Sequence, residues 1–212
     1  IIPICQGCVG ECSYCSVKFA RGSLKSYPKK DIIKEVRKFV SLGCKRINLT
    51  AQDTGCWGED IGNSLPSLLN AVIAVEGDFI VRLGMANPNF VNRHLKEMIK
   101  VFKSGKMLKF LHVPVQSGSD SVLKDMKRKY SIDDFKKVVV AFRKEIPGIC
   151  ISTDIIAGYP SETEGDFQKT VSMLKEVRPE IVNISKFGPR PGTPAAKLKQ
   201  ISTKEIKRRS ML

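Results

Sequence analysis

The stretch Cys8-Val9-Gly10-Glu11-Cys12-Ser13-Tyr14-Cys15 places three thiols in the spacing CxxxCxxC, in a loop that follows the short apolar segment 1–4. Soft thiolate ligands select zinc, copper(I) or iron–sulfur clusters. A four-iron cluster has four corners, so three thiolates leave one iron open, as in a catalytic rather than a closed structural site. Gly7 and Gly10 allow the loop to curl around a bulky group and to direct amides toward its sulfides. The spacing therefore predicts a cluster-binding loop with one exchangeable position.

A four-cysteine zinc site is the alternative, because Cys5 and Cys8 form one CxxC pair and Cys12 and Cys15 form another. The two pairs of a zinc site are normally separated by about 12 to 20 residues, so that two turns can face each other. Only three residues separate Cys8 from Cys12. This short separation favours the cluster, and a zinc-stabilised RNA-binding module without catalysis stays open as the alternative function.

The composition is that of one globular domain, with 212 residues of which 42% are apolar. No apolar run is long enough to cross a bilayer and no secretory leader is recognisable, so a cytoplasmic protein is expected. Seven cysteines, an odd number, do not suggest a disulfide framework, and Cys44, Cys56 and Cys150 are expected to be buried or incidental thiols. Because the chain begins at Ile1, we expect it to be a piece of a longer protein.

The net charge of +15, from 36 Lys and Arg against 21 Asp and Glu, exceeds what solubility requires. A basic surface that releases counterions from nucleic-acid phosphates is the usual reason for such an excess. The alternative is a solvated basic surface without a partner. Charge alone does not distinguish RNA from DNA.

Six β-rich apolar segments alternate with amphipathic segments of helical periodicity. The predicted strands are 1–4, 46–50, 79–83, 109–113, 150–156 and 181–187, and the predicted helices are 31–42, 64–76, 92–103, 119–127, 133–144 and 162–176. Such alternation implies a parallel sheet with right-handed connections. A closed eight-stranded barrel needs about 250 residues. The predicted fold is therefore α/β, a partial (βα)6 TIM-like barrel with an open side that accepts a large substrate.

The cysteine spacing, with the aromatic Tyr14 immediately before the third cysteine, resembles the signature of the radical S-adenosylmethionine (SAM) superfamily. The resemblance implies that Cys8, Cys12 and Cys15 are the ligands of a [4Fe–4S] cluster. It also implies that the open iron binds the amino and carboxylate groups of SAM, and that the barrel is of the radical SAM type.

Polar residues at two strand ends suit this cofactor, because ligands of parallel α/β folds bind beyond the carboxyl ends of the strands. Gln52 and Asp53 follow the second strand, where they can receive the ammonium group or the ribose hydroxyls of SAM. Asp53 is alternatively the cap of a turn. Gln116 and Ser117 follow the fourth strand and form a polar rim that can bond a ligand.

Two further residues are expected to contact SAM. Arg128 can pair with the methionyl carboxylate, and the alternative is a solvated arginine. Gly158 begins the segment Gly158-Tyr159-Pro160-Ser161-Glu162-Thr163, which brings the backbone close to a planar adenine. Ser161 in the same segment can also cap the next helix.

The whole chain resembles the central radical SAM domain of the tRNA methylthiotransferases. The segments that carry the resemblance follow the family's order: the cysteine loop, Ala20-Arg21-Gly22, Pro114-Val115-Gln116-Ser117-Gly118-Ser119, Asp154-Ile155-Ile156-Ala157-Gly158-Tyr159-Pro160-Ser161-Glu162-Thr163 and Pro189-Arg190-Pro191-Gly192-Thr193-Pro194-Ala195. Ser26-Tyr27-Pro28 and Asp53-Thr54-Gly55 are most similar to the archaeal and eukaryotic branch. That branch acts on N6-threonylcarbamoyladenosine at position 37 of tRNA.

The resemblance implies a transferase of sulfur-containing groups. In this chemistry an electron from the reduced cluster breaks the sulfonium bond of SAM and produces a 5′-deoxyadenosyl radical. The radical removes the hydrogen at C2 of the adenine, and sulfur enters at that position. A second SAM supplies the methyl group. No side chain is expected to be catalytic in its own right, because the protein fixes the cofactor and excludes water. The expected partners are the tRNA anticodon loop, whose nucleotides splay out readily, and an electron-donor protein. Isopentenyladenosine-37 and a ribosomal-protein aspartate are the alternative substrates.

Residues 1–195 are expected to form the radical SAM core domain. Residues 196–212 are expected to be a basic segment that leads to the RNA-binding β-barrel of family members, or alternatively a solvated helix face. Family members also carry an N-terminal domain with a second cluster, so we expect this chain to cleave SAM without completing methylthiolation. His94 and His112 are expected to be structural.

Overall fold

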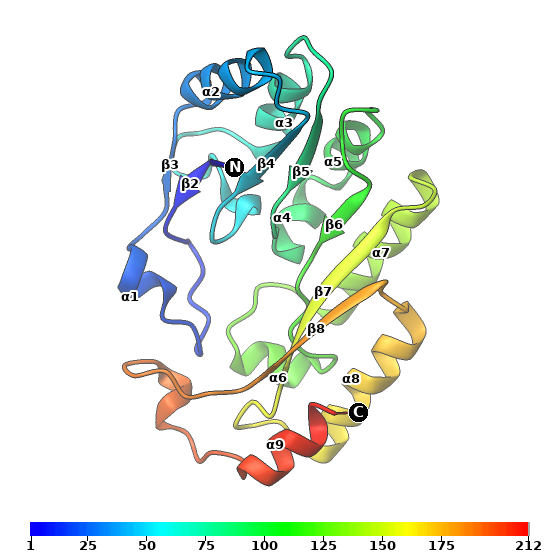
Figure 1. Ribbon diagram of the computed structural model, residues 1–212. Coiled ribbons are helices and arrows are strands. Elements are labelled where there is room, and N and C mark those ends of the chain that lie inside the picture. The colour runs from blue at the N-terminus through cyan, green and yellow to red at the C-terminus, as the bar shows by residue number, and fades with distance from the viewer. Residues whose placement is uncertain (212) are drawn as a thin grey trace.

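The computed structural model describes residues 1–211 and contains six parallel strands arranged as an open barrel (Figure 1). These strands are β1 (Ile2–Pro3), β4 (Arg46–Thr50), β5 (Ile80–Leu83), β6 (Phe110–His112), β7 (Cys150–Ala157) and β8 (Ile181–Lys186). They pair in the orders β1-β4-β5 and β6-β7-β8, and a parallel bridge between Val81 and Met107 joins the two sheets. A short antiparallel pair, β2 (Cys5–Gln6) with β3 (Lys25–Ser26), flanks the cysteine loop.

Helices surround the strands, and some of them lie at the lower end of the barrel in the view of Figure 1. They are α1 (Val17–Arg21), α2 (Lys29–Ser41), α3 (Leu65–Ile73), α4 (Pro88–Arg93), α5 (Leu95–Phe102), α6 (Asp120–Asp125), α7 (Ile132–Glu145), α8 (Glu164–Val177) and α9 (Thr203–Arg209), with the 3-10 turns η1 (Thr54–Cys56) and η2 (Pro194–Lys197). In α2, Ile32 and Val36 lie one turn apart and are buried, whereas Lys30 and Lys34 face solvent. An apolar stripe of this kind holds each helix against the sheet.

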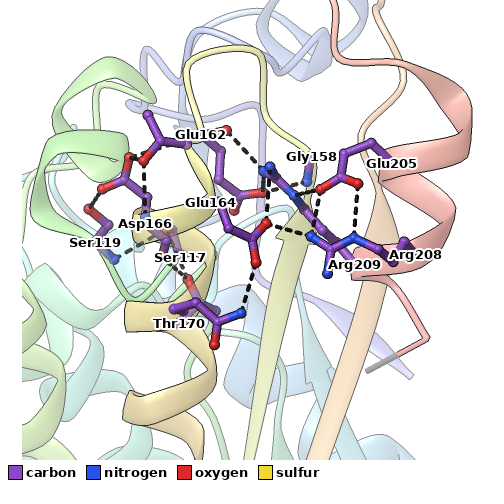
Figure 2. A network of polar contacts seen from close by, with 12 residues as sticks. Ser117, Ser119, Gly158, Glu162, Glu164, Asp166, Thr170, Glu205, Arg208 and Arg209 are labelled. Carbon is purple, nitrogen blue, oxygen red and sulfur yellow. Dashed lines mark hydrogen bonds and ion pairs between the residues drawn. The ribbon is translucent and has the colours of Figure 1, made fainter.

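The start of α8 is tied to the loop that follows β6. Thr163 and Asp166 form a capping box, in which each side chain accepts the backbone N–H of the other residue. The Asp166 carboxylate also accepts the hydroxyl of Ser119 at 2.6 Å (Figure 2). A methyl group on Gly118 would lie 2.4 Å from the Thr170 Cα, so only glycine permits this close approach of loop and helix.

The central strand β7 and the edge strand β8 differ in solvent exposure. β7 is buried along most of its length, as expected for a central strand covered on both faces. In β8 every residue except Val182 is exposed, and Ile184 keeps 45% of its surface accessible. Within residues 1–211, β8 and β1 are not paired. The barrel is therefore open along the β8 edge.

The predicted fold is confirmed, and the deviations are local. The helix predicted at 92–103 is two helices, because His94 adopts φ −112° and ψ 31° and interrupts the helical backbone between α4 and α5. The short elements α1, α9 and β2–β3 were not predicted, since two to seven residues give too little periodicity.

The basic C-terminal segment does not stand free in solvent. Its helix α9 lies beside α8, and Ile206 and Arg209 are only 9% and 7% exposed (Figure 1). Lys204 and Lys207 are exposed on the outer side of the same helix. α9 therefore has one buried side and one solvated basic face, and both the domain boundary at 195 and the role of this segment stay predictions.

Asp166→Asn is expected to destabilise the chain by about 1–3 kcal/mol at pH 7, because the carboxylate serves both the capping box and Ser119. Burial alone would raise the pKa of Asp166, but hydrogen bonds from Ser119 and Thr163 hold it well below its ordinary value. A depressed pKa in the folded state stabilises the fold above the unfolded pKa of about 3.9, and this contribution is lost as the pH falls toward the folded value. Urea unfolding curves of wild type and variant should therefore differ most near neutrality and converge in acid.

Asp133→Asn is the matched control for this experiment. Asp133 is exposed in the first turn of α7 and forms no side-chain hydrogen bond with the described residues. Its replacement should change stability by no more than about 0.5 kcal/mol. Equal losses in the two variants would show that the buried network around Asp166 is not the cause.

Candidate functional site

The cysteine loop follows β1 at the carboxyl end of the barrel and is anchored through Ser13. The Ser13 N–H donates to the Met126 carbonyl at 3.1 Å, and its hydroxyl donates to the Asp125 carbonyl at 2.7 Å. The Tyr159 hydroxyl lies 2.8 Å from the Ser13 hydroxyl, and the Ser13 carbonyl accepts the Ala195 N–H at 2.9 Å. Segments that follow β6, β7 and β8 therefore all hold the loop.

Backbone amides point at two of the predicted ligand sulfurs. The Gly10 N–H donates to Cys8 Sγ at 3.2 Å, and the Val17 N–H donates to Cys15 Sγ at 3.4 Å. Hydrogen bonds of this kind orient thiolate ligands and stabilise the negative charge of a metal centre. In the metal-free protein, burial outweighs the Val17 hydrogen bond and raises the pKa of Cys15.

Arg128 supplies the donor for the third sulfur. Its Nη1 donates to Cys12 Sγ at 3.2 Å and to the Tyr14 hydroxyl at 3.4 Å, and its Nε donates to the Tyr130 hydroxyl at 2.7 Å. Its Nη2 donates to the Asn87 side-chain oxygen and to a main-chain carbonyl. The guanidinium is therefore held by the protein at all three nitrogens and is half-buried, so the alternative of a solvated arginine is wrong, and its pairing with a SAM carboxylate stays a prediction.

The predicted site residue Asp53 continues this network. Its carboxylate is 1% exposed and accepts the Gly55 N–H at 2.9 Å, the Asn87 N–H at 3.2 Å and the Asn87 side-chain amide at 2.6 Å. Burial raises the pKa of Asp53, and the hydrogen bonds from Asn87 and Gly55 oppose this rise. Asp53 caps the turn η1, which was the alternative prediction for this residue. The Asn87 side chain links Asp53 to Arg128.

Two cysteines outside the loop lie close to it. The Cys56 thiol interacts with that of Cys8 and, together with burial, raises the Cys8 pKa. Cys5 is buried with its sulfur 3.8 Å from the Asp53 carbonyl, and it interacts with Cys56. Cys56 is buried, as predicted, and its place beside the predicted ligand Cys8 was not foreseen.

Three thiols in one loop suit the soft-ligand chemistry of an iron–sulfur cluster. In the described part of the chain, no three His, Cys, Asp or Glu side chains are close enough to hold a single metal ion. The ligands of a cluster bind different irons and are spread more widely. A methyl group on Gly10 would lie 3.2 Å from Cys8 Sγ and 3.7 Å from Cys12 Sγ, so a larger residue would project between these thiols.

Gln52 fits a polar ligand at the same end of the barrel. Its side-chain oxygen is buried without a hydrogen-bond partner among the described residues. A buried polar atom without a partner costs about 1–3 kcal/mol, which a bound donor would recover. An ammonium group of SAM is such a donor.

A cavity of about 360 Å³ opens beside the last cysteine of the loop. Its lining includes Tyr14, Cys15, Gln116, Asp154, Lys186 and Arg190. Asp154 accepts hydrogen bonds from His112 Nε2 and the Asn183 amide, both at 2.9 Å. These bonds outweigh burial and lower the pKa of Asp154, so the cavity contains a fixed carboxylate beside two cations.

The other predicted SAM contacts lie in different surroundings. Gln116 borders the cavity in the left-handed conformation, with φ 70°. Ser117 is fully buried, and its hydroxyl faces Thr170 of α8 at 3.5 Å. The structure therefore does not support Ser117 as a ligand contact. Gly158 has φ 80° and donates its N–H to the Glu162 carboxylate at 2.9 Å.

Sequence reasoning missed Asn87, Tyr130 and Asp154. Asn87 stands directly before Pro88 and follows the third strand, so inspection of every strand end would have found it. Asp154 lies within a strand, where period-2 alternation marks an inward residue. Tyr130 gave no signal, because its role depends on a tertiary contact with Arg128.

Arg128→Lys should destabilise the chain even before any metal is bound. One ammonium group cannot reach Cys12, Tyr130 and Asn87 together, and each buried partner left unsatisfied costs about 1–3 kcal/mol. Urea unfolding of metal-free protein measures this loss. Lys129→Ala, a change at the exposed neighbouring residue, is the control. If both variants unfold at the wild-type midpoint, the buried arginine network is not important for stability.

Comparison with known proteins agrees with this geometry. Residues 2–174 match the model of the radical SAM superfamily. The chain is 48% identical over 209 residues to the probable threonylcarbamoyladenosine tRNA methylthiotransferase of Methanocaldococcus jannaschii, covering 99% of this chain and 49% of that protein. The mouse threonylcarbamoyladenosine tRNA methylthiotransferase is 47% identical, with 99% and 36% covered. The chain thus spans half or less of the length of these relatives.

Solved structures share the fold at low sequence identity. The radical SAM methyltransferase TsrM from Kitasatospora setae matches with a TM-score of 0.75 at 17% identity, covering 92% of this chain and 38% of TsrM. Coproporphyrinogen III oxidase (HemN) from Escherichia coli matches with a TM-score of 0.64 at 15% identity, covering 98% and 48%. With residues 2–174 matched by the family model and the barrel shared with these enzymes, the chain belongs to the radical SAM superfamily.

Proposed function

We propose that the chain is the SAM-cleaving core of a tRNA methylthiotransferase that acts on N6-threonylcarbamoyladenosine at position 37. One observation carries the proposal: at the carboxyl end of the barrel each of the sulfurs of Cys8, Cys12 and Cys15 receives its own hydrogen bond. Such donors suit the ligands of a cluster with one open iron. The names of the archaeal and animal relatives support the substrate.

The three cysteines would hold the [4Fe–4S] cluster, and the surrounding residues would hold SAM. When bound, the cluster supplies the electron that breaks the sulfonium bond of SAM. Gln52 would accept a hydrogen bond from the ammonium group, since its oxygen has no partner among the described residues. Gln116 and the backbone at Gly158 would contact the adenosine moiety. Asp53 and Arg128 would keep Cys12 in place, and both line a cavity beside the cysteine loop from which they could also contact SAM.

The cavity beside Cys15 supports a charged rather than an apolar substrate. The threonylcarbamoyl group carries a free carboxylate, whereas an isopentenyl group is uncharged. Lys186 and Arg190 line the cavity, and neither forms an ion pair with a residue in the described range 1–211. The basic surface of the chain suits a tRNA anticodon loop. We further propose that an electron-donor protein reduces the cluster and that the protein works in the cytoplasm. No described helix is long and apolar enough to span a membrane.

Replacing Cys8, Cys12 or Cys15 with serine should abolish cluster binding and SAM cleavage. After anaerobic reconstitution with iron and sulfide, we expect about four irons per wild-type chain and release of 5′-deoxyadenosine when SAM and a reductant are added. Cys44→Ser is the control, because Cys44 is exposed and remote in sequence from the loop. Tight zinc binding without cleavage would overturn the proposal in favour of a zinc-stabilised RNA-binding module.

The product distinguishes this chain from its longer relatives. Since it spans half or less of their length, the 212 residues are expected to release 5′-deoxyadenosine without forming the 2-methylthio nucleoside. Mass spectrometry of nucleosides from tRNA that contains N6-threonylcarbamoyladenosine measures this. Detection of the methylthiolated product would contradict the expectation.

A further inference from the structure

A buried ion pair joins α9 to the loop between β7 and α8 (Figure 2). Arg209 Nη1 lies 2.7 Å from Glu162 Oε2 and 2.9 Å from the Glu162 carbonyl oxygen. The side chains are 6% and 1% exposed. Glu205 holds the other end of the guanidinium, accepting from Nε at 2.7 Å. The arginine is thus fixed by both partners.

The same pair determines the position of Gly158. Glu162 Oε2, which Arg209 contacts, also accepts the Gly158 N–H at 2.9 Å. Ile206 of α9 packs against the glycine so closely that a Cβ there would lie 2.5 Å from its Cγ1. Gly158 has φ 80°, a conformation that other residues rarely adopt. Two contacts from α9 therefore hold this backbone turn.

The next residue, Tyr159, connects the segment 158–162 to the cysteine loop. Its hydroxyl lies 2.8 Å from the Ser13 hydroxyl and donates to the Asp125 carbonyl at 3.0 Å. Its ring meets that of Tyr14 edge to face at 6.5 Å between centroids. The segment 158–162 is therefore held on one side by the predicted cluster loop and on the other by α9.

Stability alone is a weak reason for a charged pair in this place. The free-energy cost of removing two charges from water offsets most of the attraction between them. Apolar residues of similar size in the same place often stabilise the fold at least as much as the ion pair. A carboxylate at position 162 can accept both the Gly158 N–H and the Arg209 guanidinium, which an apolar side chain cannot. The pair thus specifies the geometry of the turn.

We infer that Arg209 is a positioning residue for the adenosine moiety of SAM, acting through Glu162 on the Gly158 backbone. The inference rests on the proposed function, which places the adenosine against Gly158. It makes α9 a part of the cofactor site, although the helix has no direct contact with the cysteines among its described hydrogen bonds. The chain that follows α9 in a longer protein would then be coupled mechanically to SAM binding.

The test compares two ligands on anaerobically reconstituted protein with a measured iron content. SAM and methionine share the amino and carboxylate groups, but only SAM carries adenosine. Isothermal titration calorimetry should show that Arg209→Gln weakens SAM binding by about tenfold or more, a change of about 1.4 kcal/mol, with methionine affinity and iron content unchanged. Arg208→Gln is the matched control, because Arg208 bonds Glu205 and Glu164 and does not contact Glu162.

A second variant covers the case in which Arg209→Gln does not fold. The double variant Glu162→Gln/Arg209→Gln leaves no uncompensated buried charge, and it should also lose affinity for SAM but not for methionine. Wild-type affinity for SAM in a folded variant, or equal losses for both ligands, would overturn the inference while leaving the proposed function intact. If the wild-type protein binds iron but not SAM, the proposed function fails and the inference fails with it.

Discussion

The guanidinium of Arg128 is the constraint on which the site depends. Its planar set of donors joins Cys12, Tyr130 and Asn87, which come from the cysteine loop, the loop before α7 and the end of β5. Through Asn87 the same cation balances the buried carboxylate of Asp53. A buried polar network is favourable only when every member is satisfied. The position of one cysteine sulfur therefore depends on three other loops at once.

The barrel places these loops together because parallel strands bring their carboxyl ends to one rim. Buried residues line β4, β5 and β7, whereas β8 is an exposed edge that leaves one side open. The cavity at Cys15 borders the carboxyl ends of β7 and β8. The open β8 edge therefore leaves this cavity accessible from one side of the barrel.

The strands, the partial barrel and the family could be predicted from the sequence, because buried parallel strands and the CxxxCxxC spacing are local patterns. The protein contacts of Arg128 and Ser117 could not. Arg128 contacts residues 41 and 116 positions away, and such partners are set by tertiary packing. The sequence predicted that Ser117 lies on a polar rim after the fourth strand. In the structure, the left-handed backbone at Gln116 is followed by a Ser117 side chain that faces Thr170 of α8. The packing of α9 was missed because its charged composition concealed two buried side chains.

The anchoring of Ser13 has a consequence for the order of events during synthesis. Its partners Met126, Tyr159 and Ala195 emerge from the ribosome long after the cysteine loop itself. Contacts between residues so distant in sequence form slowly, since the intervening chain must first lose its conformational freedom. The thiols are therefore translated first and ordered last. Under the proposed function, iron and sulfide would be delivered to this loop after the barrel is complete, and until then the nascent thiols would need protection from oxidation.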